Sequence, residues 1–492
     1  MHTSHSIAKS SETHCPQRSS LGVACLAITL LTFTAVDAAA GDDHVYPEAT
    51  WKTKAPAEVG LSVETLKAFS EFVGGRGCVV RHGYLVYSWG DIGRRADVAS
   101  AAKPFYAHFL WKAIEDGKIE SVDEKALKWE PRLAMINKDL GFKDREIRWR
   151  DFANQTSCYQ LVEKPGTAYA YNDWQMALFW DTLILKVYEA TYDNVDKEVF
   201  HPLLTERLHC DDKPTMMAFG TRNRAGRVAI SVRDLARFGL LYLREGNWRG
   251  KQLISREHAK MAVTNPLPNS IPRAGKKAAE MIPRQRTMGS GNKPDNQTDH
   301  FGSYSWLWWT NGVDRNGVRM FPGAPHDLFG AFGHGGPRAM WVIPSLDIIV
   351  SYNDAKMRRW TSGPKNPTND AMKLLVAAID KGELKTNVFN REQGSGAVSV
   401  SNDTGSDLSY PRSQTIERVE FDFSTHDCRA PGSDNWPITW ADDDHQYTAW
   451  GDGAGLVSPS KAADSPKWYF PRSRRFFLRQ RDELATASCS AR

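Results

Sequence analysis

In the stretch Asp97-Val98-Ala99-Ser100-Ala101-Ala102-Lys103-Pro104-Phe105, a hydroxyl and an amine stand three residues apart. We predict that this stretch begins a helix, with Ser100 at the cap or in the first turn and an apolar face that continues to a C-terminal stop at Gly117. Residues at i and i+3 share a helix face, so the Lys103 amine can reach the Ser100 hydroxyl. The stretch is therefore a candidate centre for covalent catalysis.

Such catalysis needs a base, because a serine hydroxyl is a weak nucleophile near neutral pH. An unprotonated lysine can be that base if burial or a nearby cation lowers its pKa from about 10.4. The pattern Ser-x-x-Lys begins at Ser6, Ser100, Ser290, Ser362 and Ser458. The motif alone therefore does not separate a nucleophile at Ser100 from an ordinary helix cap.

Two further motifs supply groups that a serine mechanism uses. In Pro165–Asp173, Tyr171 can relay a proton through its phenol, or it can be a partly buried structural tyrosine. The second motif, Phe332-Gly333-His334-Gly335-Gly336, precedes an apolar strand predicted at 339–343. Small residues there allow a substrate carbonyl to approach backbone N–H groups that can hold an oxyanion. The alternative is a glycine-rich start of a hairpin.

The N-terminus has the order of a secretory signal peptide. Lys9 and Arg18 precede an apolar run at 21–36, and Ala38-Ala39-Ala40 stands before the acidic 41–43. We expect residues 1–40 to be a signal peptide that is cleaved near Ala40, and the mature protein to be periplasmic or secreted without a stable membrane span. An uncleaved anchor is the alternative, but the apolar run is short for a span.

Cysteine content and charge limit the kinds of partner. After cleavage the odd set Cys78, Cys158, Cys210, Cys428 and Cys489 would remain, which disfavours a disulfide framework and leaves a single pair open. Neither C-x-x-C nor a His/Cys cluster suggests a metal. The net charge of +5 is confined to 466–492, where seven basic residues face two acidic ones. The neutral remainder argues against nucleic-acid binding.

Strand patterns at both ends surround a helical middle, which predicts an α+β fold with one sheet closed by the two ends of the domain. The strands are expected at 77–80, 84–90, 303–310, 318–321, 339–343 and 347–353. The helices outside the Ser100 stretch are expected at 62–72, 174–188, 231–244, 255–263 and 370–381. The segment 266–300 is rich in Pro, Gly, Asn and Lys, and it is either a flap over a site or disordered.

The composition changes after Lys385. Residues 386–414 are rich in Ser, Gly, Asn and Asp and are expected to form a linker. Residues 415–492 resemble one partial blade of a glycosidase-like β-propeller, followed by a basic tail that we expect to be disordered. A single blade cannot close a ring, so we expect this segment to be a remnant.

Taken together, the motifs resemble the serine β-lactamase and penicillin-binding-protein superfamily. The resemblance is closest to its class C-like branch, which includes esterases, D-amino-acid peptidases and 6-aminohexanoate-dimer hydrolases. It is carried by Ser100–Lys103, Tyr171–Asp173, His334–Gly336 and the segment 230–243, and it spans residues 45–385. It implies an antiparallel sheet flanked by helices beside an all-α subdomain, with the site between them.

The resemblance also implies roles for the catalytic residues. Ser100 would be the acyl-accepting nucleophile, Lys103 its base and Tyr171 the general acid and base. Asp173 takes the third position of a Tyr-x-Asn motif, where the family often has an asparagine that contacts the substrate amide. His334 replaces the lysine that many β-lactamases use to hold a substrate carboxylate, which weakens the case for penicillin recognition.

The substrate-binding motif His334, Gly335 and Gly336 departs from the family at its next residue. The family's oxyanion hole resembles a pair of backbone N–H groups, one from the nucleophile and one from the residue after this motif, and here that residue is Pro337, which has no N–H. Either the strand register differs and Arg338 or Gly336 supplies the donor, or the rate falls on the order of 100-fold or more.

The sequence thus predicts an exported serine hydrolase that cleaves a small ester or amide through an acyl-Ser100 intermediate, without metal or organic cofactor. The alternative activity is that of a β-lactamase or a D-alanyl-D-alanine peptidase. A third hypothesis is an inactive protein that binds cell-wall peptides or other acyl compounds, which Pro337 favours. In each case the expected partner is a small-molecule ester, amide or peptide.

Overall fold

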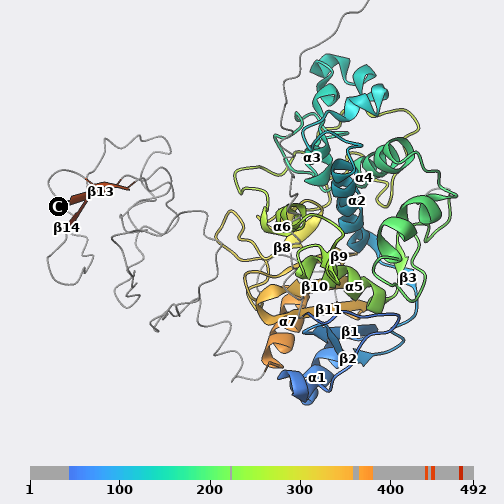
Figure 1. Cartoon of the computed structure of the whole chain (residues 1–492). Coiled ribbons are helices and arrows are strands. Elements are labelled where there is room, and N and C mark those ends of the chain that lie inside the picture. Colours follow the sequence, from blue (N-terminus) through green and yellow to red (C-terminus); the bar gives the residue numbers. More distant parts are fainter. Residues whose placement is uncertain are drawn as a thin grey trace, which may run out of the picture. The chain divides into compact units, whose positions relative to one another are not determined.

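The structure is a computed structural model that describes residues 44–221, 224–357 and 365–379, and the backbone of three short strands further on. Its main element is a seven-stranded antiparallel sheet in the order β2-β1-β11-β10-β9-β8-β7 (Figure 1). The strands are β1 (Arg76–Arg81), β2 (Tyr84–Trp89), β7 (Tyr304–Ser305), β8 (Trp308–Thr310), β9 (Phe329–Gly333), β10 (Arg338–Ile343) and β11 (Ile348–Asn353).

The two ends of the domain meet inside this sheet. Strand β1 pairs along its whole length with β11, from Arg76 opposite Asn353 to Arg81 opposite Ile348. The turn between β1 and β2 lies at His82 and Gly83, which both have positive φ values. The predicted α+β fold, an antiparallel sheet closed by the N- and C-terminal segments, is confirmed.

Helices cover both faces of the sheet. On β10, the Met340 sulfur lies 2.8 Å from where a Cβ on Gly239 of α5 (Val232–Leu243) would be, whereas the Trp341 ring contacts Phe69 of α1 (Val63–Val73) edge-on. Successive side chains of a strand point to opposite faces, so α5 and α1 lie on opposite sides. The C-terminal helix α7 (Pro367–Ala377) packs beside α1.

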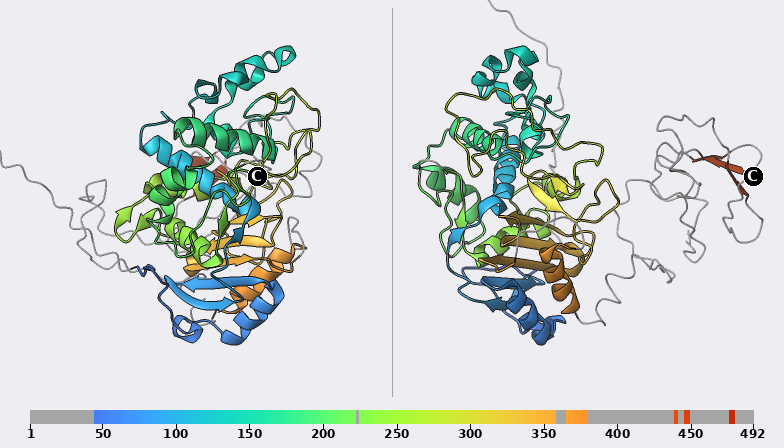
Figure 2. Two further views of the ribbon diagram at one scale, coloured as in Figure 1. Left: turned by 90° about the vertical axis from the view of Figure 1, so that its right-hand side faces the viewer. Right: turned by 180° about the vertical axis from the view of Figure 1, so that it is seen from behind.

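A helical part of the chain lies between β2 and β7 in sequence, and it gathers around α2, α3 and α4 (Figures 1 and 2). The predicted helix at 174–188 forms as α4, which continues directly into the π-helical segment η7. The elements of this part are α2 (Lys103–Glu115), η3 (Ala126–Lys128), η4 (Pro131–Met135), η5 (Lys138–Leu140), η6 (Lys143–Glu146), α3 (Trp149–Ala153), α4 (Asp173–Trp180), η7 (Asp181–Val187) and η8 (Asp196–Thr205).

Shorter elements complete the domain. The predicted helix at 255–263 forms as α6 (Arg256–Thr264), but the strand expected at 318–321 is wrong, because only an isolated bridge between Val313 and Arg319 forms there. The remaining elements are η1 (Pro56–Val59), β3 (Ala96–Asp97), η2 (Ala99–Ala102), β4 (Ala229–Ile230), β5 (Asn247–Trp248), β6 (Lys251–Gln252) and η9 (Pro344–Leu346). Strand β3 pairs with β4.

The predicted boundaries 1–40, 45–385, 386–414 and 415–492 stay predictions, since the signal peptide and the linker lie outside the described residues. Beyond 414, the structure describes an antiparallel sheet of β12 (Ile438–Trp440), β13 (His445–Thr448) and β14 (Phe476–Arg479). Strand β14 falls within the tail expected to be disordered, so at these four residues the structure has a strand instead. Within the described residues, every helix is too short or too polar to span a bilayer.

Candidate active site

The stretch around Ser100 folds as a tight turn that leads into a helix. It begins with the 3-10 helix η2, which contains Ser100, and α2 starts at Lys103. Ala99, directly before Ser100, has a φ of 53°, a value that few residues other than glycine adopt. The turn is held from behind by the Val98 N–H, which donates to the Val228 carbonyl at 3.0 Å.

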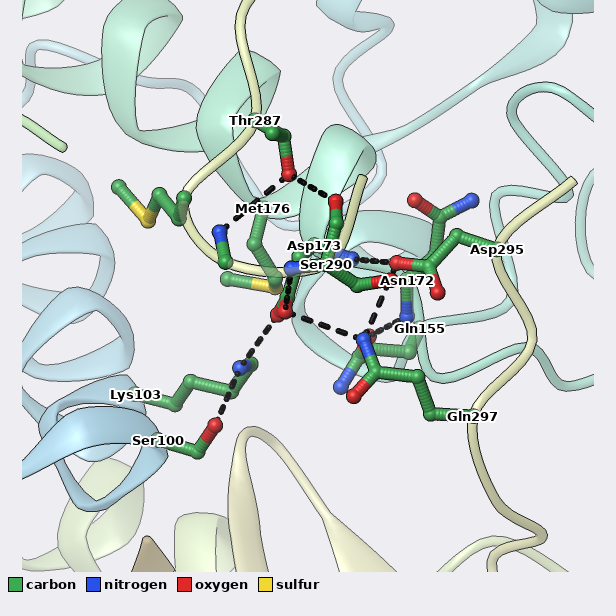
Figure 3. Close-up of polar contacts among 12 residues, drawn as sticks. Ser100, Lys103, Gln155, Asn172, Asp173, Met176, Thr287, Ser290, Asp295 and Gln297 are labelled. Atoms are coloured by element: carbon green, nitrogen blue, oxygen red, sulfur yellow. Dashed lines mark hydrogen bonds and ion pairs between the residues drawn. The ribbon is translucent and has the colours of Figure 1, made fainter. Parts of the chain in front are cut away.

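Ser100 and Lys103 make the contact that their spacing predicts. The Lys103 ammonium donates to Ser100 Oγ at 3.1 Å and to Asp173 Oδ1 at 3.1 Å (Figure 3). Lys103 is only 5% exposed. The amine therefore lies between the candidate nucleophile and a carboxylate from α4. Lys103 and Asp173 are 70 residues apart in the sequence.

Lys103 is not the low-pKa base that the sequence suggested. Burial disfavours the ammonium, but Tyr171 and Asp173 outweigh it and raise the pKa of Lys103 above its ordinary value. The condition under which Lys103 could be the base, a pKa lowered by burial or a nearby cation, is not met, because Tyr171 and the Asp173 carboxylate outweigh the effect of burial. The contacts with Ser100 and Asp173 favour the ammonium form of Lys103.

Asp173 lies at the first turn of α4, where Asn172 caps the helix by accepting from the Trp174 and Gln175 N–H groups at 2.9 and 3.0 Å. Although burial opposes ionisation, Lys103 and the donors around the carboxylate hold the pKa of Asp173 below its ordinary value. Both of its oxygens already accept hydrogen bonds from the protein. Asp173 lines the cavity, as expected of a substrate-binding residue, but its carboxylate is bound by the protein's own Lys103, Ser290 and Gln297.

Tyr171 is placed beside the Ser100 and Lys103 pair. Lys103 Nζ lies 4.5 Å from the centre of the Tyr171 ring, which is stacked on Trp309 at 6.2 Å and is 6% exposed. The Tyr171 carbonyl accepts from the Gln297 N–H at 3.0 Å. The structure therefore brings together the three residues that the sequence grouped from separate motifs.

These residues open onto a cavity of about 740 Å³. Ser100, Tyr171, Asp173, His334 and Gly335 line it, whereas Gly336 is not among its lining residues. The segment 266–300 supplies further lining residues of this cavity, namely Gly289, Ser290, Asn292, Gln297 and Thr298. Of the two interpretations of this segment, the flap is confirmed and disorder is not, so we name residues 266–300 the flap.

The glycine motif forms the turn between β9 and β10. His334, Gly335 and Gly336 all have positive φ values, and the Gly336 N–H donates to the Gly333 carbonyl at 3.1 Å. The Pro337 carbonyl accepts from the Ala355 N–H at 3.0 Å. His334 and Gly335 reach the cavity, but neither Gly336 nor Pro337 lines it.

Gly333, part of the glycine motif, makes a close backbone approach that the sequence did not predict. A Cβ on this residue would stand 2.2 Å from the Val98 carbonyl oxygen and 3.2 Å from Ala99 Cβ. The end of β9 therefore lies directly against the turn that carries Ser100. A glycine inside a strand often marks a close approach of two backbones, but this signal was not available because the sequence did not predict a strand here.

An ion network that the sequence also missed fixes the start of this turn. Asp97 accepts from Arg227 Nε at 3.0 Å and Nη2 at 2.5 Å, and from Arg338 Nη1 at 2.5 Å. Arg338 is thereby engaged through its side chain, while its backbone pairs with Gly333. The network ties β3, directly before the turn, to Arg227 ahead of β4 and to Arg338 of β10, which come from distant parts of the chain.

The described part of the chain offers few residues that could bind a metal ion or act as a reactive thiol. Its His, Cys, Asp and Glu residues form no group of three that could hold a metal ion. Cys78, Cys158 and Cys210 are free thiols there. Burial raises the pKa of Cys78 and Cys158 to about 12, so neither is a ready nucleophile.

Comparison with known proteins gives the class of the protein. A family model for beta-lactamases matches residues 64–371, well over half of the chain. The chain belongs to the beta-lactamase family, and it is a serine hydrolase by class. No curated protein matches it.

Solved structures also include chains that are similar to this one, three of which follow. A β-lactamase from Mycobacterium bovis is 17% identical, with 65% of this chain and 98% of that chain covered and a TM-score of 0.41. A penicillin-binding-protein homolog from Caulobacter crescentus is 11% identical, with 65% and 99% covered and a TM-score of 0.42. EstCE1, a hydrolase with promiscuous acyltransferase activity, is 12% identical, with 63% and 98% covered and a TM-score of 0.41.

Proposed function

We propose that this protein is an exported serine hydrolase that cleaves a small ester or amide through an acyl-Ser100 intermediate, with water as the second acceptor. The observation that carries the proposal is the 3.1 Å contact of Ser100 Oγ with Lys103 Nζ on the wall of a cavity of about 740 Å³. Tyr171 borders the same pair, so a nucleophile and two proton-carrying groups converge on one space.

In the proposed mechanism, Lys103 first releases a proton to solvent, and the neutral amine then takes the Ser100 proton while Oγ attacks the carbonyl carbon. Tyr171 relays that proton to the leaving group, and later takes one from the water that releases the acyl group. The Ser100 N–H, at the first turn of η2, is one donor to the oxyanion. The two other donors considered from the sequence fit less well, because the Gly336 N–H already binds Gly333 and Arg338 pairs with the same residue.

Gly335 is the second oxyanion donor in this proposal. It lies in the β9–β10 turn and lines the cavity beside Ser100. Pro337 stands two residues further on, and its carbonyl binds Ala355. Since Pro337 does not border the cavity, its missing N–H is no argument for an inactive binding protein.

Export rests on the sequence of residues 1–40, which lie outside the described residues. An intact mass of the protein recovered from culture medium or periplasm tests it. A mature chain that begins just after Ala40 supports export, and an uncleaved chain in the cytoplasm contradicts it.

The nucleophile is tested with a broad serine-reactive fluorophosphonate and intact mass spectrometry. We expect one adduct on the wild type and none on Ser100→Ala. Ser290→Ala is the matched control, because Ser290 also begins a Ser-x-x-Lys pattern and lines the same cavity. Labelling of Ser100→Ala, or loss of labelling in Ser290→Ala alone, would contradict the proposal.

One observation favours a second candidate function, that of a β-lactamase or D-alanyl-D-alanine peptidase. Arg224 is exposed, lines the cavity and lies 5.2 Å from the centre of the Phe219 ring. A guanidinium here can take over the substrate carboxylate that a lysine at His334 would hold. Arg224→Ala should then slow acylation by a penicillin at least about tenfold and leave a neutral ester unaffected; an equal effect on both substrates would count against this function.

A further inference from the structure

The Lys103 and Asp173 side chains form a buried ion pair at the centre of the site. Nζ and Oδ1 are 3.1 Å apart, and the two side chains are 7% and 11% exposed. Removing charges from water is costly unless each has a close partner, so the two groups hold each other in the charged form. An asparagine, the residue the family often has here, would leave the amine without a counter-ion.

The flap holds the Asp173 carboxylate from the other side (Figure 3). Oδ2 accepts from the Ser290 N–H at 2.9 Å and from Gln297 Nε2 at 3.0 Å. A Cβ on Gly289 would stand 2.4 Å from Oδ2, so the flap backbone passes directly over the carboxylate. The Asp173 N–H in turn donates to Asp295 Oδ2 at 2.7 Å. All donors to Asp173 favour its ionised form.

We propose that Asp173 is a positioning residue that keeps Lys103 as an ammonium in the resting enzyme, so that Ser100 is activated only as the pH rises into the alkaline range. The inference rests on the proposed function, because it concerns the base of that reaction. The groups that face Lys103 are Ser100, Tyr171, Asp173 and Tyr106. Those that face Asp173, besides Lys103, are Asp295, Ser290 and Gln297.

The proton balance follows from this arrangement. The Lys103 ammonium first releases one proton to solvent. The neutral amine then takes the proton of Ser100 as the bond from Oγ to the carbonyl carbon forms. That proton goes to the leaving oxygen or nitrogen as its bond to the carbonyl carbon breaks. The pKa of Lys103 is raised and the pKa of Asp173 is lowered, so the amine starts charged and has to lose a proton before it can act as the base.

The test is the rate of fluorophosphonate labelling between pH 6 and pH 11 for the wild type and Asp173→Asn. We expect the wild-type rate to rise through the alkaline range without a plateau at neutral pH. In Asp173→Asn, the counter-ion of Lys103 is lost. The pH range over which the labelling rate rises, which we call the rising limb, should then move about one pH unit or more toward lower pH. Labelling of that variant at pH 7 would then be about tenfold faster or more, relative to its own plateau.

Asp295→Asn is the matched control, since it removes a buried carboxylate of the same network that does not touch Lys103. Its rising limb should keep the wild-type position. A merely structural role of Asp173 would lower the plateau and leave the limb in place, which would overturn the proposal. So would a wild-type plateau reached by pH 8. If Asp173→Asn does not fold, Asp173→Ser removes the same charge and is judged by the same criterion.

A wild type that is not labelled at any pH would refute the proposed function, and the ion pair is then tested without activity. The ¹⁵N NMR signal of Lys103 Nζ, assigned with Lys103→Arg, distinguishes an ammonium from an amine. An ammonium signal at pH 9 in the wild type supports the inference. An amine signal at that pH overturns it.

Discussion

Replacement of Gly333 by alanine should disable the nucleophile out of proportion to its effect on stability. The new Cβ would stand 2.2 Å from the Val98 carbonyl oxygen, a separation that real Cβ atoms do not show, so one backbone has to move. Both segments at this contact are held through their backbones: β9 pairs with β10, and the Val98 N–H binds the Val228 carbonyl. Strand β9 is paired with both β8 and β10, so we expect the turn that carries Ser100 to shift.

The distance by which the Ser100 turn must move determines how much stability and reactivity the variant loses. An ordinary contact between a carbon and an oxygen needs more than 3 Å, so the clash requires a displacement of about 1 Å. Overpacking of this kind costs about 1–3 kcal/mol of unfolding free energy. A misplacement of about 1 Å in the reacting atoms costs on the order of 100-fold in rate. Gly333→Ala should therefore fold and lose most of its reactivity.

The control is Gly330→Ala on the same strand. A Cβ on Gly330 would stand 2.4 Å from the Met340 carbonyl oxygen, a clash of similar severity that falls on β10 instead of the Ser100 turn. Urea unfolding should give similar losses for both variants. Fluorophosphonate labelling should slow on the order of 100-fold in Gly333→Ala and much less in Gly330→Ala. Equal slowing in two folded variants would refute the argument.

Two further predictions concern stability. Burial opposes ionisation of Asp347, but hydrogen bonds from His82 and Arg244 lower its pKa to about 2. Since this pKa is depressed on folding, the stabilisation is present above about pH 4 and is lost as the pH falls toward 2. Asp347→Asn should cost on the order of 2 kcal/mol at pH 7 and little at pH 2 in urea unfolding; an equal cost at both pH values would contradict this. Deletion after Lys385 should leave the unfolding temperature and activity intact, because the last described contact of the domain is the bridge of Ile379 to Leu61; a large loss of thermal stability would show that the C-terminal segment supports the domain.

The sequence predicted the elements whose patterns are local. The β1–β2 hairpin has short apolar runs on both sides of a glycine turn, and β10 and β11 are rich in apolar and β-branched residues, so all four were expected close to their observed bounds. Strand β9 was not expected, because Phe329-Gly330-Ala331-Phe332-Gly333 lacks both alternation and β-branched residues. It forms because β8 and β10 pair with its two edges, and its glycines allow close backbone approaches.

The same limit explains which parts of the site could be predicted. The Ser100–Lys103 contact follows from their spacing on one turn, which a sequence displays directly. The charge state of Lys103 does not, because it depends on Asp173, which is 70 residues away, and on Ser290 and Gln297, which are 117 and 124 residues from Asp173. Local sequence gives the reacting atoms, and tertiary contacts decide which of them carries the proton.

Pro337 shows how a motif can mislead when the hairpin that carries it is short. With Gly333 opposite Arg338, the chain has only the residues between them in which to reverse direction. His334 and Gly335 occupy the side of this turn that borders the cavity, whereas Pro337 lies on the side that binds Ala355. A missing N–H matters only where a substrate oxygen can reach it. The turn geometry therefore transfers the question of the oxyanion hole from Pro337 to Gly335, which lies within the reversal and borders the cavity.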